Sequence, residues 1–152
     1  MPLKTIRPPG AEDIRQFSIF SENKVGRLNE LTQALAQRDV HLLAMSVIDN
    51  TDSAVIRIVV NYPEIAEQIL NERFFAHDTV PVLCVEIFGE HDLKKITSTL
   101  MQAEINIHYL YSFIAPAQNK CGIVLRVEDN DLGAEVLRRV GITVLSQSDI
   151  AR

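Results

Sequence analysis

Hydrophobic and polar positions along the first half of the chain predict strands and helices in a regular order. Residues 14–21 (IRQFSIFS) alternate imperfectly and contain Ile and Phe, which favours a strand. Leu28, Leu31 and Leu35 then recur at helical spacing and predict a helix over 26–38 with one apolar stripe. Further strands are expected at 40–49, 54–61 and 74–80, and a second helix from Pro63 to about Arg73. The order is strand–helix–strand–strand–helix–strand.

The second half of the chain repeats this order. Strands are expected at 82–88, 105–115, 122–129 and 142–146, and helices over the apolar stripes that begin at Leu93 and Leu132. The apolar positions also correspond, with Leu28, Leu31 and Leu35 matching Leu93, Ile96 and Leu100 at a constant offset of 65. The segment VIRIV at 55–59 likewise matches VLRVE at 124–128 at an offset of 69. We therefore expect an internal duplication, with an arm at 1–13, a first unit at 14–80 and a second unit at 81–149.

This order of elements predicts an α+β fold. A unit of this kind usually forms an antiparallel sheet with two helices on one face. Its second strand commonly lies at an edge, where backbone N–H and C=O groups have no partner. The second strands here, 40–49 and 105–115, are long and apolar. We therefore expect the two edges to pair side by side into one sheet of about eight strands, with the helices on one face.

Composition excludes several functional classes. The formal net charge is −5 and the basic residues form no long run, which disfavours a nucleic-acid partner. No stretch reaches the roughly 18 uninterrupted apolar residues of a membrane span. The N-terminal segment has no apolar core of a signal peptide, and the two cysteines are far apart in the sequence. A cytoplasmic protein with two free thiols is expected.

The segment SENKVGRL at 21–28 is the main candidate for a binding site. It lies where the first strand should pass into the first helix, and the first turn of a helix presents free N–H groups and partial positive charge. These suit a carboxylate or a phosphate. Gly26 has no Cβ, so a ligand can approach the backbone closely, although a glycine at such a turn can also be no more than a turn residue. Polar residues before it, including Asn23, would meet the ammonium group of a zwitterion.

The other side of the site is expected across the junction between the units. Backbone carbonyls of the second unit's edge strand would accept hydrogen bonds from the ammonium group, and apolar residues of both units would contact a side chain. The candidate ligand-binding residues are Ser21, Glu22, Asn23, Lys24, Val25, Gly26, Arg27, Leu28, Met45, Asn106, Ile107 and His108.

The order of elements and the first loop resemble the ACT domain, a small amino-acid-sensing module. The family's first loop reads roughly Asp/Asn-x-Pro-Gly-x-Leu, and here Asn23, Gly26 and Leu28 fit while Val25 replaces the proline. The resemblance covers about residues 14–148 and is strongest to small stand-alone proteins that carry two ACT units. It implies that an amino acid binds between the first loop of one unit and the second strand of its partner.

The second unit departs from this loop pattern. Phe20 and Leu28 are eight residues apart, whereas the equivalent Phe88 and Leu93 are only five apart, and the Gly-x-Leu step is missing. We therefore expect a complete site at the first loop and a degenerate or absent one in the second unit.

Other residue types give no competing site. The four histidines form no close pair, so no metal and no cofactor are expected. Catalytic and nucleotide-binding motifs are also missing. Arg57 is expected to face solvent or a partner. Tyr109 and Tyr111 share a strand face, where core or interface packing is the expected role.

Three functional hypotheses remain open. The first is a non-enzymatic regulatory protein that senses a free amino acid, assembles into a homodimer and modulates a separate metabolic enzyme. The second is an interaction or dimerisation module whose first loop is empty. The third is a small enzyme that uses His108 or Glu22 as a base.

Overall fold

The structure, a computed structural model, describes residues 13–22, 25–50 and 52–151. The arm expected at 1–13 lies outside this range except for Asp13. The elements in chain order are β1 (Ile14–Glu22), α1 (Arg27–Gln37), β2 (Leu42–Asp49), β3 (Ser53–Val60), α2 (Pro63–Glu72), β4 (Ala76–Glu86), α3 (Glu90–Gln102), β5 (Ile107–Ser112), β6 (Gly122–Val127), α4 (Asn130–Arg139), β7 (Val144–Leu145) and α5 (Gln147–Ile150). The pattern of apolar positions indicated each of these except the short helix α5, but it divided β4 into two expected strands.

The sheet is continuous and has seven strands, not the eight expected. Its order is β2-β3-β1-β4-β6-β5, and β7 also pairs with β4. The strands expected separately at 74–80 and 82–88 are the single strand β4, which pairs with β1 up to Val82 and with β6 from Leu83. Pro81, which lacks a backbone N–H, lies where the pairing passes from β1 to β6, and this position explains why the strand tolerates it.

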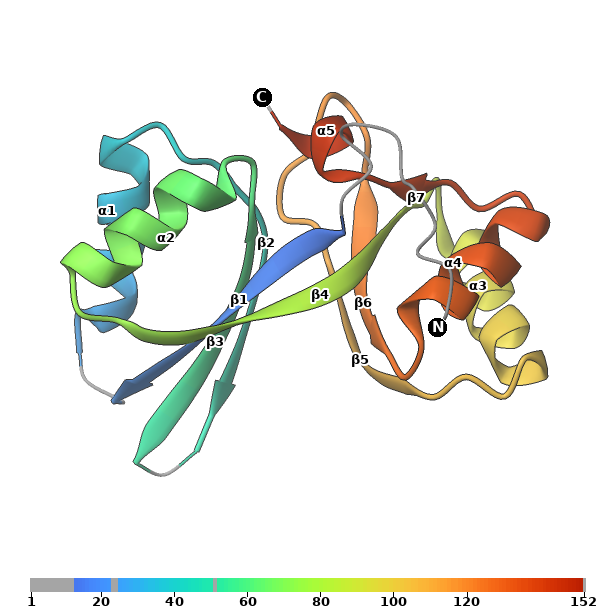
Figure 1. The fold of residues 1–152 in the computed structure, drawn as a ribbon, viewed down its shortest axis with the longest axis horizontal. Helices are drawn as coiled ribbons and strands as arrows, with labels where there is room; N and C mark the ends of the chain where they lie inside the picture. The colour runs from blue at the N-terminus through green and yellow to red at the C-terminus, as the bar shows by residue number, and fades with distance from the viewer. Residues whose placement is uncertain (1–12, 23–24, 51, 152) are drawn as a thin grey trace, which may run out of the picture.

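Strand β4 therefore belongs to two units, which we define by their elements. The N-terminal unit contains β1, α1, β2, β3, α2 and the first part of β4. The C-terminal unit contains the rest of β4, α3, β5, β6, α4 and β7. Figure 1 shows the helix pair α1–α2 and the helix pair α3–α4 at opposite ends of the molecule, with the curved sheet between them.

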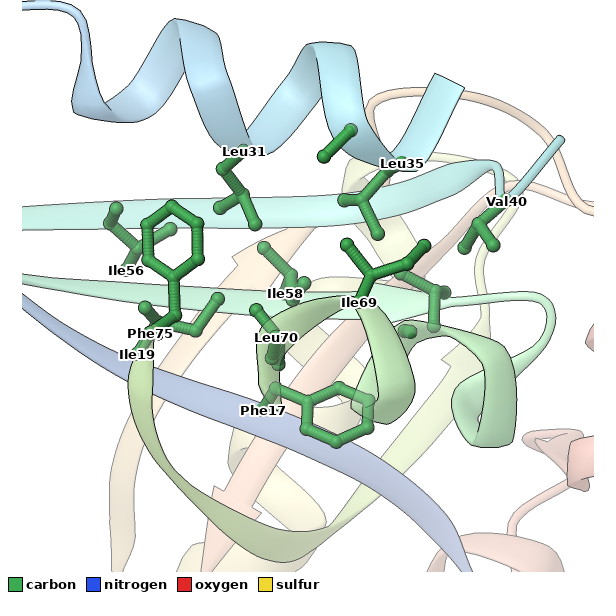
Figure 2. Close-up of a cluster of buried hydrophobic side chains, with 13 residues drawn as sticks. Phe17, Ile19, Leu31, Leu35, Val40, Ile56, Ile58, Ile69, Leu70 and Phe75 are labelled. Atoms are coloured by element: carbon green, nitrogen blue, oxygen red, sulfur yellow. The ribbon is translucent and has the colours of Figure 1, made fainter. Parts of the chain in front are cut away.

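Each unit has its own core between its helices and the sheet. In the N-terminal unit, Leu31 and Leu35 of α1 and Ile69 and Leu70 of α2 point toward the buried strand residues (Figure 2). An equivalent cluster lies beneath α3 and α4, and Leu100 at its centre is fully buried. Burial of such side chains contributes about 1.5–3 kcal/mol each, so both helix pairs are fixed to the sheet.

Pairing of the two edge strands along their length was expected, but the structure does not show it. β2 meets the segment directly after β5 at one isolated bridge, between Ala44 and Phe113, supported by a hydrogen bond from the Ile114 N–H to the Leu43 carbonyl at 2.7 Å. Because the shared strand β4 already joins the two units, the curvature and twist of one sheet decide how far its edges approach. A third buried cluster lies on the inner face of the curved sheet, opposite the face covered by α1–α4, and includes Cys84 and Ile150 of the short helix α5.

The four long helices end in the same way. Each is followed by one residue with a left-handed backbone: Asp39, Phe74, Glu104 and Gly141. In each case the N–H of the next residue bonds back to the carbonyl five residues earlier, at 2.9–3.0 Å. The next residues, Val40, Phe75, Ile105 and Ile142, are all buried. This arrangement is the Schellman motif, and its recurrence supports a duplicated fold.

Candidate ligand-binding site

The first loop places Gly26 directly before α1. Its φ of 91° and ψ of −13° are left-handed, a conformation that favours glycine. A Cβ built on Gly26 would meet no atom within 4 Å, so backbone conformation rather than lack of space selects glycine here. The Glu30 N–H bonds to the Gly26 carbonyl at 2.8 Å, which closes the first turn of the helix. No described side chain caps the N–H groups of this turn.

Charged groups differ between the first turns of α1 and α3. In α1 the acidic residue of the first turn, Glu30, lies 2.9 Å from the guanidinium of Arg27, which also stacks 3.9 Å from the Phe75 ring centroid. In α3 the first turn carries Glu90 and Asp92, and the Asp92 carboxylate accepts a hydrogen bond from the Phe88 N–H at 2.7 Å. Glu90 lies 3.7 Å from Lys94, so the first turn of α3 carries two partnered acids and that of α1 carries one. The additional acid at α3 disfavours an incoming anion there.

A shallow groove of about 290 Å³ lies at the end of the sheet where β1 leads into the first loop. Its lining residues are Phe20, Ser21 and Glu22 of β1 and Ser53, Ala54 and Val55 of β3. These six form three consecutive cross-strand pairs at the end of the sheet. Ser21 and Glu22 were predicted from the sequence, and the others were missed. The other four residues could be identified only from the register between β1 and β3, which a single sequence does not specify.

The remaining predicted residues of the N-terminal unit lie in different environments. Val25 is fully exposed and Leu28 is 40% exposed, so both form surface next to Gly26. Met45 is partly buried and packs against the core beneath α1. Asn23 and Lys24 lie outside the described residues.

The predicted residues of the C-terminal unit are not brought to the first loop within one chain. Asn106 and His108 are exposed, Ile107 packs partly against the other core, and all three lie at the start of β5. In Figure 1 this end of β5 and the end of β1 lie on opposite sides of the molecule. The contact between β2 and β5 is at Phe113, six residues beyond Ile107, a separation of roughly 20 Å along a strand.

The inner face of the sheet holds two groups with raised pKa values. Burial raises the pKa of the Cys84 thiol, so it stays protonated and unreactive. Burial, together with Cys84 and Tyr109, raises the pKa of Tyr111, and nearby Arg57 only partly opposes this.

In the described ranges, no group of three or more His, Cys, Asp or Glu side chains is placed to hold a metal ion. None of the described helices is long and apolar enough to cross a bilayer.

Solved structures share this architecture. Protein BT0572 from Bacteroides thetaiotaomicron is similar over 94% of this chain and 99% of that chain, with 31% identity and a TM-score of 0.83. The ligand-free regulatory subunit of aspartate kinase from Thermus thermophilus matches 85% of this chain and 93% of that one, with 12% identity and a TM-score of 0.59. The corresponding subunit from Thermus flavus matches 84% and 89%, with 14% identity and a TM-score of 0.56. The last two similarities show a shared fold.

The family comparison covers nearly the whole chain. A comparison with curated proteins gives no match. The family model described as ACT domain pair matches residues 12–152, and this fold is typical of regulatory, non-catalytic domains. The chain therefore belongs to the ACT domain pair family.

Proposed function

We propose that the protein is a regulatory protein that binds a free amino acid at the first loop, with the ligand carboxylate at the start of α1. The observation that carries this proposal is the left-handed Gly26 directly before the first turn of a helix. Backbone N–H groups at such a turn, together with the helix dipole, favour a carboxylate. The groove lined by Phe20 and Val55 lies at the end of β1, which leads into this loop, and would provide apolar surface for a side chain.

The second unit supports a single site per chain. Its helix α3 begins after a shorter loop, and Asp92 already bonds to the Phe88 N–H. An amino-acid carboxylate would meet the like charge of Asp92 there, beside Glu90, which is paired with Lys94 at 3.7 Å. We therefore propose that the N-terminal unit binds ligand and that the C-terminal unit does not.

A second copy of the chain would complete the site. From Met45 to Ile48 the outer edge of β2 has no strand partner among the described residues. Val47 and Ile48 on this edge are 47% and 41% exposed. Antiparallel pairing of two β2 edges satisfies these backbone groups and follows a twofold axis. The partner's β2 would then supply the wall that β5 does not supply within one chain.

The regulated protein is proposed to be a separate enzyme. The architecture is shared with regulatory subunits of aspartate kinase, whose name describes a subunit that regulates an enzyme. We propose the same division of labour here, with a metabolic enzyme as the target and a homodimer as the assembly.

Thermal unfolding in the presence of each standard amino acid tests this function. A ligand present at 100 times its Kd adds about 2.7 kcal/mol, which raises the Tm by about 5–10 °C in a chain of this size. Gly26→Asn should abolish the response, because the asparagine side chain would cover the approach to the first turn of α1. Gly141→Asn is the matched control, because Gly141 has a similar φ of 85° at the far end of α4.

The outcome separates the remaining hypotheses. A response to one or a few amino acids that Gly26→Asn removes and Gly141→Asn retains supports the amino-acid sensor. The absence of any response contradicts the sensor and favours an interaction module, for which exposed Phe74 and Phe88 offer apolar surface.

A further inference from the structure

A fully buried glutamine joins the two units on the inner face of the sheet. The Gln16 side chain is 0% exposed. Its amide nitrogen donates to the Tyr109 hydroxyl at 2.7 Å and to Ser18 Oγ at 3.1 Å, and its amide oxygen accepts from the Tyr111 hydroxyl at 2.6 Å. Gln16 belongs to β1 of the N-terminal unit, and both tyrosines belong to β5 of the C-terminal unit.

An arginine makes a second contact to the same tyrosine. The Arg57 guanidinium lies 3.7 Å from the centroid of the Tyr109 ring. Tyr109 also stacks on Tyr111, with ring centroids 6.3 Å apart. We call Gln16, Ser18, Arg57, Tyr109 and Tyr111 the inter-unit cluster. It is the place where polar side chains of β1 and β3 hold the edge strand of the other unit.

The strands that line the groove also carry the inter-unit cluster. Phe20 of the groove lies opposite Val55, and Ser18 of the cluster lies opposite Arg57, in consecutive same-face pairs of β1 and β3. Side chains two residues apart on a strand share a face, so a line of contacts runs from the groove to Tyr109. A shift of β1 against β3 at the groove would change the position of Gln16 and Arg57.

We propose that occupancy of the first-loop site is transmitted through the inter-unit cluster to strand β5, whose outer edge then acts as the surface that responds to ligand. This inference rests on the proposed function, because it requires a ligand at the first loop. It goes beyond that function by naming the strand to which ligand binding is transmitted. β5 suits this role because its outer edge from Ile107 to Ser112 has no strand partner within the described part of the chain.

Amide hydrogen exchange of the whole chain tests the proposal. The twenty standard amino acids are first screened by Tm, and exchange is then followed with each amino acid that raises it. Helix α4 is the internal reference, because global stabilisation slows exchange in α4 and β5 alike. The proposal predicts that ligand slows exchange of the β5 amides at least about five-fold more than that of the α4 amides.

Two variants separate transmission from simple stability. Tyr109→Phe removes the hydroxyl that Gln16 binds but keeps the ring under Arg57, and it should still bind ligand while losing the selective slowing in β5. Tyr62→Phe is the matched control, because it removes a tyrosine hydroxyl outside the cluster, and it should behave as the unmodified chain. Arg57→Gln, which leaves the hydrogen bonds of Gln16 in place, should also weaken the selective slowing.

The results distinguish this inference from the proposed function. Ligand binding with equal slowing in β5 and α4, or selective slowing that persists in both Tyr109→Phe and Arg57→Gln, overturns the inference and leaves the sensor intact. A screen in which no amino acid raises the Tm overturns both.

Discussion

The side-chain amide of Gln16 donates a hydrogen bond to the hydroxyl of Tyr109 at 2.7 Å, across 93 residues of sequence. This bond connects the first strand of one ACT unit to the edge strand of the other. Together with the shared strand β4, it makes the two units a single structural body. The candidate binding loop at the end of β1 is therefore linked to the C-terminal unit through its own strand.

Loss of the Gln16 amide should destabilise the fold. Gln16→Leu keeps the packing volume similar but leaves two tyrosine hydroxyls without their amide partner, so the free energy of unfolding should fall by about 1–3 kcal/mol. Urea denaturation measures the change, and Tyr62→Phe should stay within about 0.5 kcal/mol of the unmodified chain. Equal stability of Gln16→Leu and the unmodified chain would show that the hydrogen bonds of Gln16 contribute nothing to stability.

Alkaline pH should weaken the fold through Tyr111 and Cys84. Burial raises the pKa of both groups in the folded chain, from ordinary values of 10.0 and 9.0. Burial disfavours the charged, deprotonated form of each group. The unfolded chain therefore loses these protons at a lower pH than the folded chain. Their contribution to stability is fully present below the ordinary values and is lost as pH rises beyond them.

The pH effect has a measurable slope. Above pH 10, each of the two groups should lower the free energy of unfolding by up to about 1.4 kcal/mol per pH unit. Urea denaturation from pH 8 to 11 gives this slope, and Tyr111→Phe should make it shallower. An unchanged slope in Tyr111→Phe would contradict the assignment to Tyr111.

Phe74 should be a point of backbone strain. It has a φ of 58° and its side chain is 90% exposed, so little packing offsets the left-handed conformation. Phe74→Gly should raise the free energy of unfolding by about 1 kcal/mol, because glycine adopts this conformation without a Cβ clash. Phe74→Ala, which keeps the Cβ, should show no such gain in thermal unfolding; equal gains in both variants would point to the aromatic ring instead.

Gly122 should be intolerant of a side chain. A Cβ there would lie 2.6 Å from the Val85 carbonyl oxygen and 3.2 Å from the Phe113 ring. Gly122→Ala must therefore push β6 away from β4 and should lower stability by about 1–3 kcal/mol. Gly89→Ala is the control, because a Cβ at Gly89 meets nothing within 4 Å. Similar stabilities of the two variants would contradict the tight pairing of β4 with β6.

Much of this fold could be predicted from the period of apolar positions. Leu31 and Leu35 and their counterparts Ile96 and Leu100 are buried beneath helices, as the repeat indicated. The single strand β4 was missed, because strands were expected separately at 74–80 and 82–88, and a strand tolerates the intervening Pro81 only where its neighbours change partners. The partial contact between β2 and β5 also could not be predicted, since it depends on the curvature of the whole sheet.

The candidate site was predictable only where it is local in sequence. Gly26 before a helix is visible in the segment itself, and the structure gives it the left-handed conformation that a glycine permits. Val55 and Ser53 reach the groove through the register of β3 against β1, which involves residues more than thirty positions away. The left-handed backbone conformation of Phe74 and Glu104 was likewise not predictable, because these residue types do not favour it and their buried neighbours impose it.

Backbone amide chemical shifts, followed by NMR while an amino acid that raises the Tm is added, test the central claim most directly. We predict the largest shifts at Arg27, Leu28 and Asn29, where the carboxylate would accept hydrogen bonds, and small shifts at His91 and Asp92 of the second unit. Shifts confined to the second unit, or no shift at the start of α1 on saturation, would contradict the account.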